Sequence, residues 1–254
     1  MAQKYDASDI VVLEGIEPVR KRPAMYIGGT DKIGLHHLVW EILDNGIDEV
    51  INGYATTILV ELDKNRDGIR ITDNGRGIPI DQHKKYKKAA LEIIMTTLHA
   101  GGKFKTGSYI HSGGLHGVGA SVVNALSKHM TVTVKRDGRE WIQSYQAGKP
   151  ESPVKKGGTI RGTGTSVYFR PDHLIFNKNT QFDPGLLRET LEAKSYLHKG
   201  LKITFKDGTT GQTYQFFHEQ GIQEYLAKLV KDRGRKPTAE FVFYVDRKID
   251  ENGD

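Results

Sequence analysis

At 254 residues, the chain is long enough for one large domain or two small ones. It contains no cysteine, which rules out disulfides and thiolate metal sites and fits a cytoplasmic protein. The formal net charge of +6 is compatible with a nucleic-acid partner but does not require one. The chain has neither a signal-peptide core nor the roughly 18 consecutive apolar residues of a membrane span, so no membrane partner is expected.

The first half of the chain predicts helices around one pair of strands. Residues 1–18 form an N-terminal arm, residues 20–29 have the composition of a loop, and the glycine-bearing segment 99–111 is expected to be a loop or lid. Helical spacing of apolar residues and strand-like alternation predict the other elements. They are helices at 35–51, 89–98 and 120–126 and strands at 56–62 and 68–72.

The second half is dominated by strands. They are expected at 130–135, 140–147, 165–169, 201–206, 213–217 and 240–245, with helices at 186–196 and 222–231. Early helices and a later, mostly antiparallel sheet predict an α+β fold, a two-layer sandwich on a mixed sheet. We expect one main domain over 19–218 and, over 219–254, the start of a second domain that is cut short.

The predicted helix at 35–51 carries an acidic, amide-bearing face. At 100° per residue, six polar side chains lie on one side of it, namely His37, Glu41, Asp44, Asn45, Asp48 and Asn52. Solvated faces usually mix lysine with glutamate, and this face has no lysine. Magnesium prefers oxygen ligands, and an asparagine carbonyl supplies one without the charge that repels phosphate. An ordinary solvated face is the alternative.

Asp73 ends the second predicted strand and begins the segment Asp73–Pro79. Gly75 and Gly77 permit backbone paths that are closed to other residues, and Pro79 fixes the exit of the chain. A carboxylate here can accept a hydrogen bond from an exocyclic amine such as that of adenine. The alternative is an ordinary Asp-Asn-Gly turn.

A glycine-rich loop precedes the helix at 120–126. Its glycines are Gly113, Gly114, Gly117 and Gly119, and backbone amides at a helix N-terminus favour phosphate. The spacing matches neither the Rossmann nor the Walker pattern. A loop without function is the alternative for this segment alone. All three segments in this order favour a nucleoside triphosphate with its magnesium ion.

These three segments resemble the ATP-binding motifs of the gyrase, heat-shock chaperone, histidine kinase and MutL superfamily. Within it, the stretches 19–28, 98–104 and 162–165 are most similar to the B subunits of bacterial DNA gyrases, and the Gly-Leu-His-Gly-Val-Gly loop is typical of type II topoisomerases. The resemblance runs from about Tyr5 to about Leu229. It implies a Bergerat-type ATP-binding fold for the main domain.

The resemblance implies roles for particular residues. Glu41 would be the general base and His37, one turn earlier, would orient it; Asn45 would be the Mg²⁺ ligand. Asp73 would bind the adenine amine with help from Thr165, and Ile71 would pack on the base. The other implied nucleotide contacts are Tyr5, Glu49, Arg76, Gly77, Ile78, Pro79, Lys103, Tyr109, Leu115, His116, Gly117, Val118 and Gly119.

The resemblance also implies partners and departures. Glu49, Arg76 and Arg136 would form an ion-pair rim that, with Asp73 and Thr165, contacts aminocoumarin inhibitors. The implied cofactors are ATP and Mg²⁺. The implied partners are the gyrase A protein, in an A2B2 heterotetramer on DNA, and a second copy of the chain on ATP binding if the transducer domain is present. Ile110 stands where many relatives have lysine, and Gly46 replaces a common alanine or serine and is expected to enlarge the pocket wall. We expect slow hydrolysis by this chain alone, because it ends before the family's second-domain lysine.

Three other hypotheses remain open. The equivalent ATPase of topoisomerase IV shares the same motifs. A kinase or chaperone of the superfamily fits less well, because its glycine loop differs. A basic DNA-binding module with incidental motifs predicts salt-dependent DNA binding without ATP.

Overall fold

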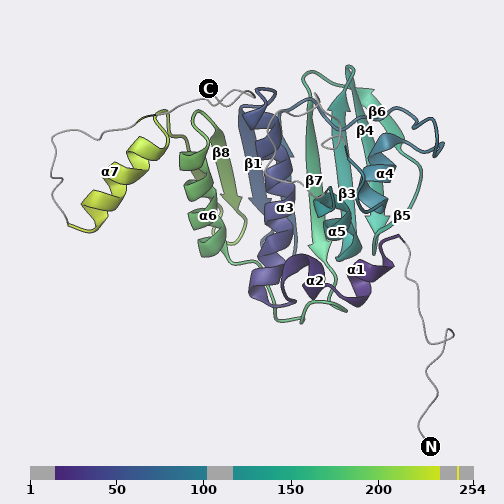
Figure 1. Cartoon of the computed structure of the whole chain (residues 1–254), viewed down its shortest axis with the longest axis horizontal. Coiled ribbons are helices and arrows are strands. Elements are labelled where there is room, and N and C mark those ends of the chain that lie inside the picture. Colours follow the sequence, from purple (N-terminus) through teal and green to yellow (C-terminus); the bar gives the residue numbers. More distant parts are fainter. Residues whose placement is uncertain (1–14, 102–116, 235–244, 246–254) are drawn as a thin grey trace, which may run out of the picture.

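The computed structural model describes residues 15–101, 117–234 and 245. In these ranges nine strands form one sheet, and helices cover one of its faces (Figure 1). The strand order is β5-β4-β3-β7-β2-β1-β8-β9, with β6 also paired to β4. Only the β1–β8 pair is parallel among the described strands. The predicted α+β sandwich with a mixed, mostly antiparallel sheet is therefore confirmed.

The helices and strands follow the predicted order closely. The helices are α1 (Glu17–Lys21), α2 (Ala24–Ile27), α3 (Lys32–Ile51), α4 (Ala90–Thr96), α5 (Gly119–Ala125), α6 (Pro184–Leu197) and α7 (Ile222–Asp232). The strands are β1 (Thr57–Leu62), β2 (Ile69–Asp73), β3 (Ser127–Arg136), β4 (Arg139–Gln146), β5 (Lys149–Pro150), β6 (Lys155–Thr159), β7 (Gly164–Pro171), β8 (Lys202–Asp207) and β9 (Gln212–Phe216).

The core lies between α3 and the covered face of the sheet. Asp31 begins α3 by accepting a hydrogen bond from the backbone N–H of Gly34 at 3.0 Å. The apolar stripe of α3 is buried against the centre of the sheet, where Ile69 and Ile71 of β2 point inward. Alternate residues of β2 point to the opposite face, which has no helix over it (Figure 1).

A buried histidine joins α3 to the start of α6. His36 is 1% exposed, and its Nδ1 lies 2.7 Å from the carbonyl oxygen of Lys32. A carbonyl can only accept, so Nδ1 carries the proton, and Nε2 accepts from the backbone N–H of Asp183 at 2.9 Å. Burial lowers the pKa of His36, which keeps the ring neutral in this role.

Two local predictions were wrong. The segment 20–29 is not a loop throughout, because it includes the end of α1 and all of α2. A proline lies in the first turn of α1 and another directly precedes α2, and the two helices bury Val19 and Ile27. The Gly157-Gly158 turn signal lies inside β6, a short strand on β4 that the sequence did not predict. The N-terminal arm and the strand expected at 240–245 fall outside the described ranges, apart from residue 245, and the domain boundary at 218 stays a prediction.

No helix in the described ranges is long and apolar enough to cross a membrane.

Gly164→Ala is expected to lower the free energy of unfolding by about 2–3 kcal/mol. Gly164 has φ +143°, and a Cβ atom there would lie 2.1 Å from the carbonyl oxygen of Asp73. Backbone cannot move aside as a flexible side chain can, so β7 would be pushed from the end of β2. Urea unfolding would measure the loss. Gly158→Ala is the control, because nothing lies within 4 Å of its Cβ position, and equal effects in the two variants would contradict this account.

Candidate nucleotide site

Residues from all three sequence motifs line one cavity of about 430 Å³ on the helix-covered face. It lies among α3, α4, α5 and the strands β2 and β7. Fourteen of the predicted site residues line it. They are Glu41, Asn45, Glu49, Ile71, Asp73, Arg76, Gly77, Ile78, Pro79, Gly117, Val118, Gly119, Arg136 and Thr165.

Asp73 lines this cavity, and backbone N–H groups bind one of its two carboxylate oxygens. Its Oδ1 accepts from the backbone N–H of Gly75 at 2.8 Å and from that of Thr165 at 3.3 Å. Neither donor reaches Oδ2, which therefore keeps its capacity to accept from a ligand. Burial raises the pKa of Asp73 to about 6, against the lowering effect of the two N–H groups.

Glu49 and Arg76 form a bidentate ion pair at the cavity. Arg76 Nη2 lies 2.7 Å from Glu49 Oε1, and its Nε and backbone N–H both donate to Oε2. The Arg76 guanidinium also lies over the Tyr54 ring, 3.6 Å from its centroid. This pair fixes the turn after β2 to the C-terminal end of α3.

Arg136 joins the rim differently from the expectation. Its Nη1 donates to the carbonyl oxygen of Gly77 at 2.7 Å, and its Nε lies 3.8 Å from the carboxylate of Asp137. The Glu49–Arg76 ion pair of the predicted rim is present, Arg136 binds the backbone beside it, and an ion-pair rim of all three residues stays a prediction.

The acidic face of α3 divides into three environments. Glu41, Asp44 and Asn45 line the cavity, whereas Asp48 is 1% exposed and is part of the interior. Asn52 ends the helix, and its Nδ2 donates to the carbonyl oxygen of Asp48 at 2.7 Å. Only the middle of the predicted face therefore faces a ligand.

A lysine from a distant helix partly neutralises this face. Lys194 of α6 places its Nζ 2.5 Å from Asp44 Oδ1. Lys194 therefore supplies, from another helix, a positive charge that the polar face of α3 does not itself carry. A polyphosphate entering the cavity meets a carboxylate that already has a counter-ion.

Lys194→Met is expected to weaken binding of a magnesium-bound ATP analogue about three- to tenfold and to leave adenosine binding unchanged. Without its counter-ion, Asp44 repels the phosphates and does not affect the base. Calorimetric titration of both ligands tests this. Lys206→Met is the control, because Lys206 pairs with Glu61 on the uncovered face of the sheet. Equal weakening of adenosine binding would indicate that Lys194 has a purely structural role.

Gly119 brings the start of α5 into contact with Glu41. A Cβ atom at position 119 would lie 2.2 Å from Glu41 Oε2 and 3.3 Å from Glu41 Cβ. Glycine is therefore required for the carboxylate to occupy its place beside the glycine-rich loop. Gly46, by contrast, does not line the cavity; its Cβ position faces Ile58 and Asp73, so the expected enlargement of the pocket wall is wrong.

The structure does not bring every predicted residue to the cavity. His37 is not among its lining residues, and its orienting role stays a prediction. Tyr5, Lys103, Tyr109, Leu115 and His116 lie outside the described ranges, as does Ile110.

Several lining residues were not predicted. Ile94 and Met95 of α4 form part of the wall, and so does Val167 of β7. Val167 lies two residues after Thr165 on one strand, so strand alternation could have placed it on the same face. The contribution of α4 depends on helix packing, which has no local sequence signal.

The donor set fits a nucleotide better than a bare metal ion. No group of three or more His, Cys, Asp or Glu side chains in the described ranges could hold a metal by itself. Magnesium commonly uses one or two protein oxygens together with substrate phosphates and water. The Asn45 side chain at the cavity wall suits that arrangement, and Asp73 Oδ2 suits an amine donor on a base.

Several known proteins are similar to this chain in sequence or in fold. The DNA gyrase B protein of Thermotoga maritima is 51% identical over 235 residues, which cover 92% of this chain and 36% of that protein. The DNA topoisomerase 4 B protein of Staphylococcus aureus is 52% identical over 227 residues, which cover 88% of this chain and 34% of that protein. The chain thus spans about a third of the length of these curated relatives.

A solved structure and a family model agree with these relatives. The 43K ATPase domain of Thermus thermophilus gyrase B, crystallised in complex with an aminocoumarin, matches with a TM-score of 0.79 at 41% identity, covering 89% of this chain and 57% of that one. The model described as histidine kinase-, DNA gyrase B-, and HSP90-like ATPase matches residues 30–174, which include every element that builds the cavity. The chain belongs to this family of histidine kinase-, DNA gyrase B- and HSP90-like ATPases.

Proposed function

We propose that the cavity binds ATP with Mg²⁺ and that the chain is the ATPase region of a DNA gyrase B protein. The observation that carries the proposal is the cavity itself, which joins Glu41, Asn45, Asp73 and Gly119 from three separate motifs. Asp73 Oδ2 accepts from no described donor, and it favours adenine over guanine because adenine carries a donor amine where guanine carries an oxygen.

Each residue has a distinct part in the proposed reaction. Glu41 takes a proton from the attacking water at its carboxylate, and the lack of a side chain at Gly119 leaves room for that carboxylate. Asn45 would contribute its side-chain oxygen to a bound Mg²⁺ ion, and that ion would neutralise charge on the phosphate oxygens. Ile71 and Ile78 provide apolar contacts for the base. Phosphoryl transfer to water needs this positioning more than covalent chemistry.

Calorimetric titration with non-hydrolysable ATP and GTP analogues in the presence of Mg²⁺ tests the binding site. Saturable binding of the ATP analogue, with much weaker binding of the GTP analogue, is expected. Competition by an aminocoumarin is also expected, because the Glu49–Arg76 pair and Asp73 lie at one cavity. Equal affinity for the two analogues would contradict the assigned role of Asp73.

For the longer protein we propose ATP-dependent negative supercoiling of DNA in an A2B2 complex with the gyrase A protein. ATP would drive dimerisation of two gyrase B chains through the N-terminal arm, and this chain alone would turn over slowly. The similar identities to the gyrase and topoisomerase 4 relatives keep decatenation by topoisomerase IV as the second candidate. Reconstitution with each type of partner protein, followed by supercoiling and decatenation assays, separates the two.

A further inference from the structure

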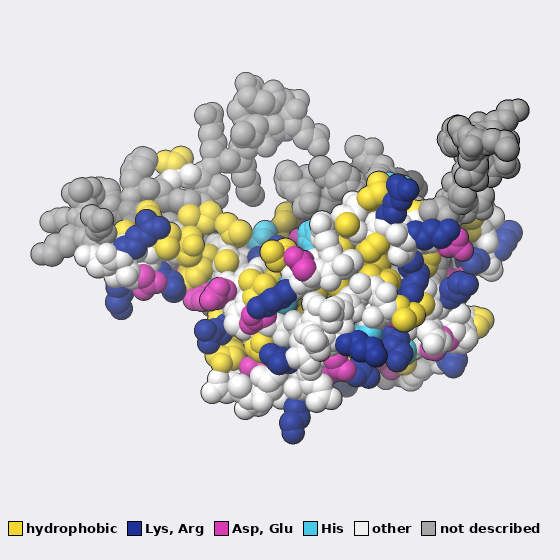
Figure 2. Space-filling model, turned by 90° about the horizontal axis from the view of Figure 1, so that it is seen from below, with side chains coloured by type: hydrophobic (Ala, Val, Ile, Leu, Met, Phe, Trp, Pro, Cys, Tyr) yellow, Lys and Arg dark blue, Asp and Glu magenta, His cyan; other side chains and the backbone are white. Residues whose placement is uncertain are grey.

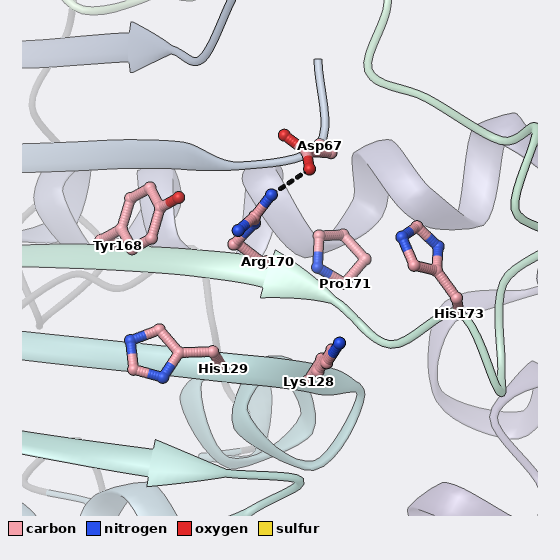
Figure 3. Close-up of a pocket in the computed structure, with 7 residues that line it drawn as sticks. All are labelled: Asp67, Lys128, His129, Tyr168, Arg170, Pro171 and His173. Carbon is pink, nitrogen blue, oxygen red and sulfur yellow. Dashed lines mark hydrogen bonds and ion pairs between the residues drawn. The ribbon is translucent and has the colours of Figure 1, made fainter. Parts of the chain in front are cut away.

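A second cavity lies on the uncovered face of the sheet, on the other side from the nucleotide cavity. It has a volume of about 270 Å³. Strand β7 contributes to both cavities, because Thr165 and Val167 line the first while Tyr168 and Arg170 line the second. Figure 3 shows the side chains of the second cavity on β3, on β7 and on the loops that carry Asp67 and His173, with helices behind the sheet.

The lining of this cavity is basic. Lys128 and Arg170 carry two permanent positive charges against one carboxylate, Asp67, which leaves one positive charge before either histidine, His129 or His173, is protonated. Asp67 is already paired with Arg170. Lysine and arginine side chains gather beside histidine on the underside of the molecule, where β7 ends and β3 begins (Figures 1 and 2).

An irregularity in β3 sets the position of the free lysine. Ser127 pairs with Pro171 and His129 pairs with Arg170, so Lys128 is an extra residue without a partner across the ladder. Such bulges redirect a side chain and often lie beside functional sites. Lys128 is exposed, and its ammonium group makes no ion pair with any described carboxylate.

One arrangement of its hydrogen bonds leaves a ring N–H group of His129 able to donate to a ligand. Its Nε2 lies 3.0 Å from Thr131 Oγ1, which in turn lies 3.1 Å from Ser144 Oγ. If the Thr131 hydroxyl donates to Nε2, the proton of the neutral ring sits on Nδ1, which makes no hydrogen bond to a described group. Tyr168 keeps its ring at the cavity wall, because its hydroxyl donates to Asp63 at 2.7 Å.

We propose that this cavity binds a backbone phosphate of duplex DNA. The donors are the Lys128 ammonium, the unused N–H groups of Arg170 and the ring N–H of His129. Basic groups continue across the uncovered face, since Arg70 lies over the Tyr168 ring, 5.1 Å from its centroid, and shares the carboxylate of Glu61 with Lys206. A row of this kind suits a polymer with repeated phosphates better than one free anion. The proposal does not depend on the nucleotide cavity.

Fluorescence anisotropy with a labelled DNA duplex of about 20 base pairs, over about 50–200 mM salt, tests the proposal. Lys128→Gln is expected to weaken binding several-fold and to reduce the slope of log K against log salt by about one. His173→Gln, also at an exposed position, is expected to weaken binding less. Lys84→Gln is the matched control, because Lys84 is exposed and lies in the lysine-rich turn before α4, away from the cavity.

Three outcomes would overturn the proposal. Lys128→Gln could bind DNA as the wild type does, or Lys84→Gln could lose as much affinity, which would indicate only a diffuse surface charge. Inorganic phosphate could bind with the same dependence on Lys128 while DNA does not, which would indicate a free-anion site. The same titration on an Asp73→Asn variant separates this site from the nucleotide cavity, since DNA binding is expected to survive there.

Discussion

Asp73→Asn is expected to weaken binding of an ATP analogue by about 100-fold or more. The N–H groups of Gly75 and Thr165 both point at Oδ1 and will hold the asparagine oxygen in that place. The asparagine NH₂ group must then replace Oδ2 and face the adenine amine, so that two donors oppose each other. Calorimetry on the variant and the wild type measures the loss.

The same substitution is expected to stabilise the unliganded protein at pH 8 by about 1–3 kcal/mol. The folded-state pKa of Asp73, about 6, lies above its ordinary value of 3.8. The contribution of Asp73 to stability is therefore fully present below pH 3.8 and is lost as the pH rises through about 6. Asparagine avoids that loss, so the two proteins should differ most at pH 8 and least at pH 4.

Urea unfolding at both pH values separates loss of binding from loss of folding. Asp81→Asn is the control, because Asp81 is exposed and its side chain makes no hydrogen bond or ion pair with a described residue. Wild-type affinity for the analogue should also fall as the pH drops through 6, because the protonated carboxyl group has lost its charge. A variant that is both less stable at pH 8 and unable to bind would contradict this interpretation of Asp73.

Local periodicity predicted the elements that carry the site. The apolar spacing of α3 placed Glu41 and Asn45 on one side of the helix, and the alternation of β2 placed Asp73 at its end. Each inference needed only neighbouring residues. The order of the motifs then indicated a common site, and the cavity contains residues from all of them.

Long-range partners could not be predicted in this way. Lys194 lies 150 residues after Asp44, and no local pattern relates the two. Burial of Asp48 depends on how α3 sits on the sheet, so the helical wheel alone could not separate it from the residues that line the cavity. The cavity on the uncovered face required the register between β3 and β7, including the extra residue Lys128. These features arise from tertiary packing.

Glu41→Gln is expected to reduce ATP hydrolysis by the longer protein about 100- to 10,000-fold and to leave affinity for an ATP analogue within about threefold of the wild type. Glutamine has nearly the volume of glutamate and keeps a polar group at the cavity wall, but it cannot accept the proton of the attacking water. Steady-state hydrolysis and calorimetry give the two quantities. Glu61→Gln is the control, since Glu61 lies on the uncovered face beside Lys206.

Gly119→Ala provides an independent test of the position of that carboxylate. The added methyl group overlaps Glu41 Oε2 and must displace it, whereas the amide of residue 119 remains. Turnover should therefore fall with little change in analogue affinity, as for Glu41→Gln, and the double variant should be no slower than Glu41→Gln alone. Wild-type turnover by Glu41→Gln would exclude Glu41 as the base. Further slowing in the double variant would mean that Gly119 acts through some other group.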